Sequence, residues 1–248
     1  MFTANANGTN IRPLLADLGW LGAPNWSPDG QQLAVYVAPT DGLVTGGLVN
    51  PDGTGFHAFN SPDRTLQLAC FEWSPEGDRL ACEGFDETDP ARDGLYTVRA
   101  TDGGDLRPVT THHRVGLCGY SPDGSRIAYL QEDQQLTVVN VDGTGKRRIS
   151  DTMFGLGCDW SPDGRTILAA SDGSLFLVGL DGTTNELPVH GGLTNSYGPA
   201  FSPDGSSIIF MAAMDGEPFD IYTMRLDGSD LVQITDTPEE EDFADWGP

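Results

Sequence analysis

Short apolar runs recur along the chain at intervals of about 40–50 residues. They are rich in β-branched, aliphatic and aromatic side chains, which suits strands buried on both faces. The runs cover residues 32–37, 79–82, 126–130, 166–169 and 207–210. No stretch shows sustained helical periodicity, so the pattern predicts an all-β chain.

A five-residue turn motif precedes each apolar run. It consists of an aromatic residue followed by Ser, Pro, Asp or Glu, and Gly, in residues 26–30, 73–77, 120–124, 160–164 and 201–205. Ser suits the first place of a type I turn, Pro presets φ at the second, and Gly at the fourth tolerates a positive φ. The motif therefore predicts a tight turn between two antiparallel strands.

A second turn follows later in every repeat. It carries Asp-Gly at residues 52–53, 102–103, 142–143, 181–182 and 227–228. Asp-Gly between two apolar runs is a strong hairpin signal. Each repeat is therefore expected to contain four strands, and repeats of this length are typical of a β-propeller, with one four-stranded blade per repeat.

The two ends of the chain are predicted to share one blade. Asn7-Gly8-Thr9 is the second turn again, and Gly8 precedes Trp26 by the same interval that separates Gly228 from Trp246. We therefore expect a six-bladed ring closed by both ends, because closure removes exposed sheet edges. The expected blades are residues 16–60, 67–110, 115–150, 155–189 and 196–235, with 243–248 plus 1–15 as the closing blade. A five-bladed ring is the alternative. The second strand of the closing blade is missing, so either that blade has three strands or residues upstream of Met1 were removed or are not in the sequence.

The repeat resembles that of the TolB-like propellers, which are related to WD-repeat proteins. The resemblance rests on the aromatic-Ser-Pro-Asp-Gly turn, the strand after it and the later Asp-Gly-Thr hairpin, and it covers essentially residues 1–248. It implies an isolated propeller, because nothing here matches the α/β domain that TolB carries. It also implies an extracytoplasmic location, periplasmic or secreted, although no signal peptide is present in this chain.

The charge of the chain restricts its partners. There are 13 Lys and Arg residues against 37 Asp and Glu, which gives a formal net charge of −24. This charge argues against binding nucleic acid or anionic membrane surfaces. No run of apolar residues is long enough for membrane insertion. We expect a monomer whose partner is a protein or peptide, and a cationic partner or bound cations would suit the surplus of acidic residues.

The four cysteines are too few for a disulfide scaffold. Cys118 and Cys158 each stand two places before a repeat aromatic, whereas Cys70 and Cys82 flank one hairpin. Cysteine often behaves as a small core residue, so buried free thiols are expected. A Cys70–Cys82 disulfide remains the alternative.

The variable loops hold the candidate binding residues. In a propeller, the loops between blades and those joining the second and third strands emerge on one face, around the central channel. Candidate aromatic anchors for a partner are Trp20, Phe85, Tyr197 and Phe219, accompanied by Asp86, Asp89 and Arg114. The acidic loop that includes Asp86 and Asp89 offers oxygen ligands for calcium, although its spacing is not that of an EF-hand.

Three loop histidines form the candidate metal site. His112, His113 and His190 could bind a transition metal near the channel mouth. No resident cofactor is expected beyond such a divalent cation, calcium or a transition metal. No Gly-x-Ser-x-Gly nucleophile motif is present, so no catalytic residue is assigned. The expected function is a non-catalytic platform that binds a protein or peptide. The alternative is a metal-assisted hydrolase or lyase at the channel mouth.

Overall fold

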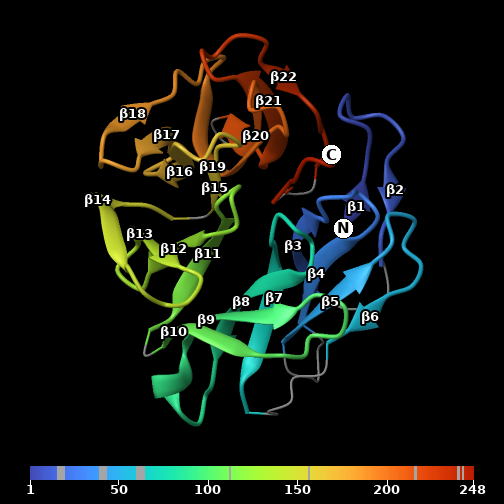
Figure 1. Ribbon diagram of the computed structural model, residues 1–248. Helices are drawn as coiled ribbons and strands as arrows, with labels where there is room; N and C mark the ends of the chain where they lie inside the picture. Colours follow the sequence, from blue (N-terminus) through green and yellow to red (C-terminus); the bar gives the residue numbers. More distant parts are fainter. Residues whose placement is uncertain are drawn as a thin grey trace.

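The computed structural model describes residues 1–15, 20–38, 44–59, 65–111, 113–155, 157–214, 217–238, 241 and 243–248. Antiparallel β-sheets are grouped around a central axis (Figure 1). The expectation of an all-β chain is confirmed, because apart from one 3-10 turn, η1 (Pro90–Arg92), the regular elements of the described residues are strands.

Five units contain four strands each. Unit 1 comprises β3 (Trp20–Trp26), β4 (Leu33–Ala38), β5 (Thr45–Val49) and β6 (His57–Ala58), and unit 2 comprises β7 (Gln67–Trp73), β8 (Arg79–Phe85), β9 (Gly94–Arg99) and β10 (Arg107–Thr111). Unit 3 comprises β11 (Val115–Tyr120), β12 (Arg126–Gln131), β13 (Gln135–Asn140) and β14 (Arg147–Met153). Unit 4 comprises β15 (Cys158–Trp160), β16 (Thr166–Ser171), β17 (Ser174–Gly179) and β18 (Thr184–Glu186). Unit 5 comprises β19 (Leu193–Phe201), β20 (Ser207–Met214), β21 (Asp220–Arg225) and β22 (Val232–Gln233).

Units 1 and 2 are joined into one sheet by a single parallel pair, Thr45 opposite Leu68. The other three units are separate four-stranded sheets. In each unit the second strand carries the most deeply buried residues. Leu33, Leu80, Ile127, Ile167 and Ile208, for example, are at most 2% exposed. The hydrophobic core therefore lies between neighbouring units.

The repeat turn forms as the residues predict. In all five copies the glycine N–H donates to the carbonyl of the turn serine, at 2.8 Å, and the glycine φ lies between +67° and +71°. The Asp123 carboxylate accepts from the Ser121 hydroxyl and from the backbone N–H of Ser125. The turn carboxylates thus hold the backbone in place and are structural.

The first and last segments of the chain lie between units 5 and 1. At the N-terminus β1 (Phe2–Thr3) pairs with β2 (Arg12–Pro13), and the turn between them repeats the second hairpin turn, with Gly8 N donating to Asn5 O. Gly8 approaches Ile234 beyond β22, just as Gly182 approaches Ile149 of the preceding unit. Pro248 packs against Gly30 of unit 1, in the way that each turn proline packs against the glycine of the next unit. Figure 1 shows both termini on this side of the molecule.

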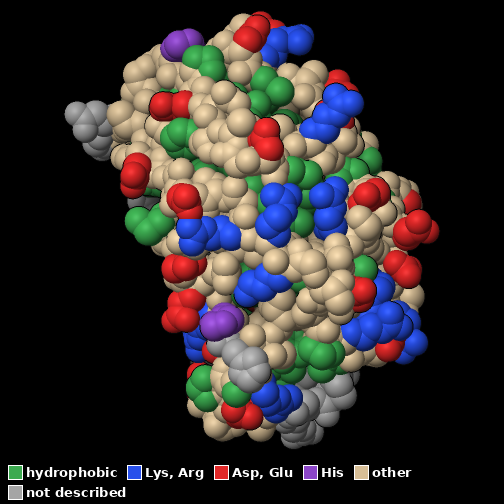
Figure 2. Space-filling view, turned by 60° about the vertical axis from the view of Figure 1, so that its left-hand side comes forward, with side chains coloured by type: hydrophobic (Ala, Val, Ile, Leu, Met, Phe, Trp, Pro, Cys, Tyr) green, Lys and Arg blue, Asp and Glu red, His purple; other side chains and the backbone are tan. Residues whose placement is uncertain are grey.

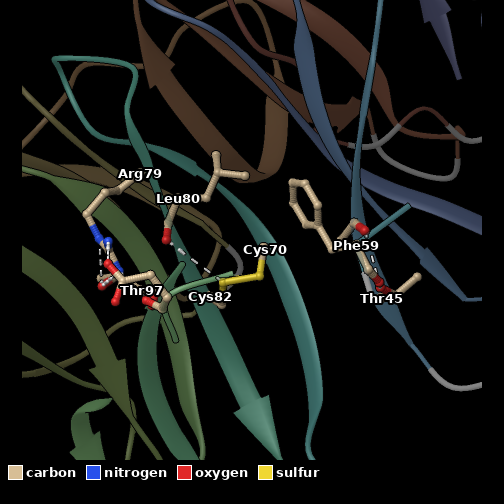
Figure 3. Close-up of a disulfide and its surroundings, with 9 residues drawn as sticks. Thr45, Phe59, Cys70, Arg79, Leu80, Cys82 and Thr97 are labelled. Carbon is tan, nitrogen blue, oxygen red and sulfur yellow. Dashed lines mark hydrogen bonds and ion pairs between the residues drawn. A yellow bond between two sulfur atoms is a disulfide. The ribbon is translucent and has the colours of Figure 1, made fainter. Parts of the chain in front are cut away.

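The expectation of free thiols is wrong, because all four cysteines form disulfides. Cys70 on β7 stands directly opposite Cys82 on β8, with their Cα atoms 3.9 Å apart (Figure 3). Cys118 and Cys158 occupy equivalent places on β11 and β15, the first strands of neighbouring units, with their Cα atoms 4.8 Å apart. Disulfides usually join Cα atoms about 4.4–6.8 Å apart. The Cys118–Cys158 pair lies within this range, and the Cys70–Cys82 pair lies just below it.

Candidate functional site

A cavity of about 460 Å³ lies on the central axis. Its wall includes residues from the first strand of every unit or from the residue just before it, together with the segment near the C-terminus. These wall residues are Ala23–Asn25, Ala69, Phe71, Glu72, Gly116, Leu117, Gly157–Asp159, Gly198–Ala200 and Phe243–Asp245. The units are therefore arranged around this cavity, which places it where a propeller has its channel.

Four carboxylates contribute to the cavity wall: Glu72, Glu83, Asp159 and Asp245. Glu72, Asp159 and Asp245 each stand immediately before a repeat tryptophan, and Glu83 lies on the second strand of unit 2. Glu72 and Glu83 lie on the paired strands β7 and β8 of unit 2, whereas Asp159 and Asp245 come from unit 4 and the C-terminal segment. The arrangement of the units around the axis therefore brings these three parts of the chain together.

Each of these carboxylates accepts a hydrogen bond from a neighbouring unit. Asp159 Oδ2 accepts from the backbone N–H of Phe201 at 2.7 Å, and Asp245 Oδ2 accepts from the backbone N–H of Trp26 at 2.9 Å. The same contact thus joins units 4 and 5 and also joins the C-terminal segment to unit 1. Glu83 Oε1 accepts from Leu117 N at 2.8 Å, and Glu72 Oε1 accepts from the Asn25 side chain at 3.2 Å.

The carboxylates of the cavity are held in surroundings that oppose their charge. Burial raises the pKa of Asp159 and of Glu83 to about 7 each, and that of Asp245 to about 6. The pKa of Glu72 is raised well above its ordinary value by burial and by the nearby charges of Asp159, Asp245 and Glu83. Each carboxylate is disfavoured in its charged form by loss of water and, at Glu72 and Asp159, also by a neighbouring acid. A positively charged group in the cavity would favour the ionised carboxylates and so lower their pKa values.

Aromatic side chains form much of the remaining wall. Tyr36, Phe71, Phe85 and Phe243 line the cavity, and the rings of Tyr36 and Phe71 lie 5.9 Å apart. Aromatic faces attract cations as well as apolar groups. The Arg114 guanidinium already lies 5.5 Å from the centre of the Phe85 ring.

The structure separates the predicted aromatic anchors. Phe85 lines the cavity, whereas Tyr197 and Phe219 pack against one another with ring centres 6.0 Å apart. Tyr197 directly precedes Gly198 of the cavity wall. Trp20 begins β3, but its side chain lies outside the described residues.

The acidic side chains of the predicted loop are held by hydrogen bonds to residues in the loop or beside it. Asp86 is only 1% exposed and accepts from Thr65, Thr88 and Arg92. The hydrogen bonds from the side chains of Thr88 and Thr65, that from Thr88 foremost, and from the backbone N–H groups of Thr88 and Asp89 lower its pKa to about 2. Asp89 caps η1 by accepting from Ala91 N, and Asp93 receives Arg114 at 3.2 Å. In this arrangement Asp86 and Asp89 hold the loop, and Arg114 is positioned beside Phe85.

The predicted histidine site is only partly visible. His112 lies outside the described residues, and neither His113 nor His190 is among the cavity-lining residues. Within the described ranges, no group of three or more His, Cys, Asp or Glu side chains is arranged to hold a metal ion. The cavity carboxylates and the acidic loop lie within these ranges, so neither forms such a group.

Positive side chains are gathered on the outside of the propeller. Figure 2 shows Lys and Arg side chains across the face that is on the left of Figure 1, with acidic side chains around them. Exposed Lys146, Arg147 and Arg148, at the start of outer strand β14, lie in this part of the chain. The axial cavity thus carries carboxylates, whereas the outer face in Figure 2 mixes positive and negative side chains, as in the ion pair between Arg148 and Asp151.

The cavity carboxylates were not among the predicted site residues. Their signal in the sequence is an acidic residue directly before the repeat aromatic at Glu72, Asp159 and Asp245. The chain has 37 acidic residues, and most of them stand in turns and loops. An acidic residue before the repeat aromatic therefore does not stand out among them. Glu83 carries no comparable signal.

Comparison with known proteins agrees with this architecture. Residues 156–178 match the family described as WD domain, G-beta repeat. The chain is 28% identical to protein Atu1656 of Agrobacterium fabrum over 91% of its own length and 60% of that protein. It is 32% identical to a protein TolB homolog of Chlorobium luteolum over 48% of its length and 29% of that protein. The chain thus spans less than two thirds of these relatives.

Solved structures share the fold. The putative TolB from Agrobacterium tumefaciens superimposes with a TM-score of 0.71 at 21% identity, over 88% of this chain and 81% of that one. TolB from Acinetobacter baumannii gives 0.73 at 18% identity, over 92% and 57%. A puromycin hydrolase gives 0.62 at 15% identity, over 90% and 39%, so the same fold occurs within an enzyme. These findings define a β-propeller. More particularly, they support the TolB-like propeller family for this chain.

No helix in the described ranges is long and apolar enough to cross a membrane.

Proposed function

We propose that this chain is a six-bladed propeller that binds a protein or peptide by taking one of its positively charged side chains into the axial cavity. The observation that carries the proposal is the convergence of Glu72, Glu83, Asp159 and Asp245 on a cavity with aromatic walls. Ligand sites are commonly concave and largely apolar, with a few convergent polar groups. The concave shape of the cavity suits a single side chain or chain end of the partner better than a broad, flat partner surface.

Six blades are supported by contacts that repeat around the ring. The hairpin glycines Gly53, Gly103, Gly143, Gly182 and Gly228 each approach the preceding unit, and Gly8 approaches unit 5 in the same way. Gly53 approaches Leu14, so the N-terminal segment precedes unit 1. Five complete units and the segment shared by both ends therefore account for six positions.

The charge in the cavity favours a cationic ligand. Burial has already removed much of the water from the carboxylates, so little further dehydration is needed when a ligand enters. An ammonium or guanidinium group would lower their raised pKa values, and its affinity would increase as the pH rises through about 6 to 7. A neutral side chain of the same size would gain only the apolar contacts.

The disulfides support an extracytoplasmic site of action. Disulfides persist in oxidising compartments and are rare where thiols are kept reduced. Both Cys70–Cys82 and Cys118–Cys158 link strands of the propeller, and Cys158 also lines the cavity. This location agrees with the one implied by the resemblance to TolB-like proteins.

The proposal is tested with labelled peptide libraries of one length that carry a central arginine or, in the matched library, citrulline. Fluorescence polarisation at pH 8 would report binding to the whole chain, and Asp159→Asn should weaken binding of arginine peptides about 10- to 100-fold. The exposed Asp172 provides a control, Asp172→Asn, which should leave the affinity unchanged. Equal binding of arginine and citrulline peptides, or equal affinity for the wild type and Asp159→Asn, would refute the role of the cavity charge.

A further inference from the structure

Arg114 stands at the rim of the axial cavity. It directly precedes β11, whose Gly116 and Leu117 belong to the cavity wall. Its guanidinium carbon lies 5.5 Å from the centre of the Phe85 ring, and Phe85 also lines the cavity. The Arg114 side chain is 65% exposed. An accessible positive charge therefore lies beside an aromatic ring of the wall.

Asp93 fixes the position of this guanidinium. Asp93 is only 5% exposed, and its Oδ2 accepts from Arg114 Nε at 3.2 Å, while its Oδ1 accepts from the backbone N–H of Asp86 at 2.7 Å. The Asp93 carbonyl also accepts from the backbone N–H of His113 at 3.1 Å. One buried residue thus holds the arginine side chain and the residue before it. Holding a guanidinium in place before a ligand arrives reduces the entropy lost on binding.

The contact with Asp93 leaves one edge of the guanidinium open. In the described structure the Arg114 side chain donates through Nε alone, so its two Nη groups have no partner there. Two Nη groups side by side match the two oxygens of a carboxylate. The described residues that line the cavity include four carboxylates and no Lys or Arg. Arg114 therefore offers a ligand what the cavity wall does not, a charged donor for a negative group.

The spacing along β8 sets the distance between the two charges that a ligand must carry. Phe85 and Glu83 both line the cavity and stand two residues apart, which is about 7 Å along a strand. An extended lysine or arginine side chain holds its positive charge about 7 Å from the carboxylate of the same residue. With that carboxylate at Arg114, beside Phe85, the positive charge lies level with Glu83. Glu72 stands opposite Ala81, so its backbone lies about 7 Å deeper along the same strand.

We propose that the ligand is the C-terminal end of a polypeptide whose last residue is lysine or arginine. Its terminal carboxylate binds the Nη groups of Arg114, and its side chain enters the cavity. This assignment rests on the proposed function, since the cavity must take a cationic side chain. It adds a contact of opposite sign, which selects chain ends over internal basic residues. A free basic amino acid is a poorer ligand, because its α-ammonium group would lie next to Arg114 and be repelled by it.

The first test uses the unaltered chain and three labelled peptides of one sequence. They end in arginine with a free carboxylate, in arginine with an amide, or in citrulline with a free carboxylate. Fluorescence polarisation at pH 8 should show the first peptide bound about 5- to 20-fold more tightly than the second. Equal binding of these two, with the citrulline peptide still weaker, would overturn this proposal and leave the proposed function standing. Equal binding of the first and third peptides would refute the role of the cavity charge and, with it, both proposals.

The second test assigns the carboxylate contact to Arg114. In Arg114→Gln the free-acid and amide peptides should bind equally, while arginine is still preferred over citrulline, because the cavity carboxylates are unchanged. Arg225→Gln is the matched control and should behave as the wild type. Arg225 is 54% exposed and also donates through Nε to an aspartate, Asp230, but neither residue lines the cavity. Free arginine should compete more weakly than the free-acid peptide. A preference for the free acid that survives in Arg114→Gln, or equal competition by free arginine, would overturn the proposal.

Discussion

The Asp159 carboxylate makes the stability of the protein depend on pH. Its pKa is about 7 in the folded protein, because of burial and the nearby Asp245, against 3.8 for an ordinary aspartate. Below pH 4 both the folded and the unfolded chains hold the proton, so the group has little effect. As the pH rises, the unfolded chain loses its proton first, and folding becomes less favourable until about pH 7.

The magnitude follows from the size of this pKa difference. About three pH units at 1.36 kcal/mol each give an upper limit of about 4 kcal/mol of destabilisation above pH 7. At pH 5 the same calculation gives about 1–2 kcal/mol. Asp159→Asn removes the charge and keeps an oxygen that can accept from Phe201 N. The variant should therefore be more stable than the wild type, and by about 2–3 kcal/mol more at pH 8 than at pH 5.

Urea denaturation of both proteins at pH 5 and pH 8 measures this difference. The slope against urea should stay the same, since the surface exposed on unfolding does not change. Asp172→Asn is the control, because Asp172 is exposed and asparagine also tolerates its positive φ of 48°. A gain in stability of equal size at both pH values, or no gain at pH 8, would show that the Asp159 charge is not disfavoured in the folded protein.

Two further predictions concern the repeat turns and the disulfides. Asp123→Ala removes the acceptor of Ser121 and Ser125 and should lower the free energy of unfolding at pH 7 by about 1 kcal/mol. Because these hydrogen bonds lower the pKa of Asp123 to about 2, the loss should shrink as the pH falls from 4 to 2, as acid titration by circular dichroism would measure; a constant loss would contradict it. Thiol titration of the denatured, unreduced chain should find no free thiols, and four after reduction. Replacing Cys118 and Cys158 together by Ser should cost about 1 kcal/mol more than replacing Cys70 and Cys82, since their loops span 40 and 12 residues; an equal cost would count against the loop-entropy argument.

The repeat could be predicted from local signals alone. Ser-Pro-Asp-Gly and Asp-Gly specify turns through the φ values and hydrogen bonds of four adjacent residues, and the structure forms these turns in every unit. The apolar runs between the turns then become the buried strands. Even the relation between the two ends was visible, because Gly8 and Gly228 stand at the same distance from a tryptophan.

The cysteine pairing could not be predicted with the same certainty. Cys118 and Cys158 are one repeat apart, so they occupy the same place in neighbouring units. Whether two such places touch depends on how closely β11 and β15 approach each other near the axis. The sequence shows the equivalence of the two positions and not their distance, and burial alone equally suits a free thiol.

What the sequence by itself determined is therefore the repeating unit, because turns and strand patterns depend on neighbouring residues. Only the tertiary structure decided which side chains converge. Glu72, Asp159 and Asp245 come together because the first strands of the units and the C-terminal segment face one axis, and Glu83 joins them from the hairpin that carries Glu72. Loss of water there raises the pKa values of all four. The physical reason is that a charge within a cavity depends on groups brought from distant repeats, whereas a turn depends on four consecutive residues.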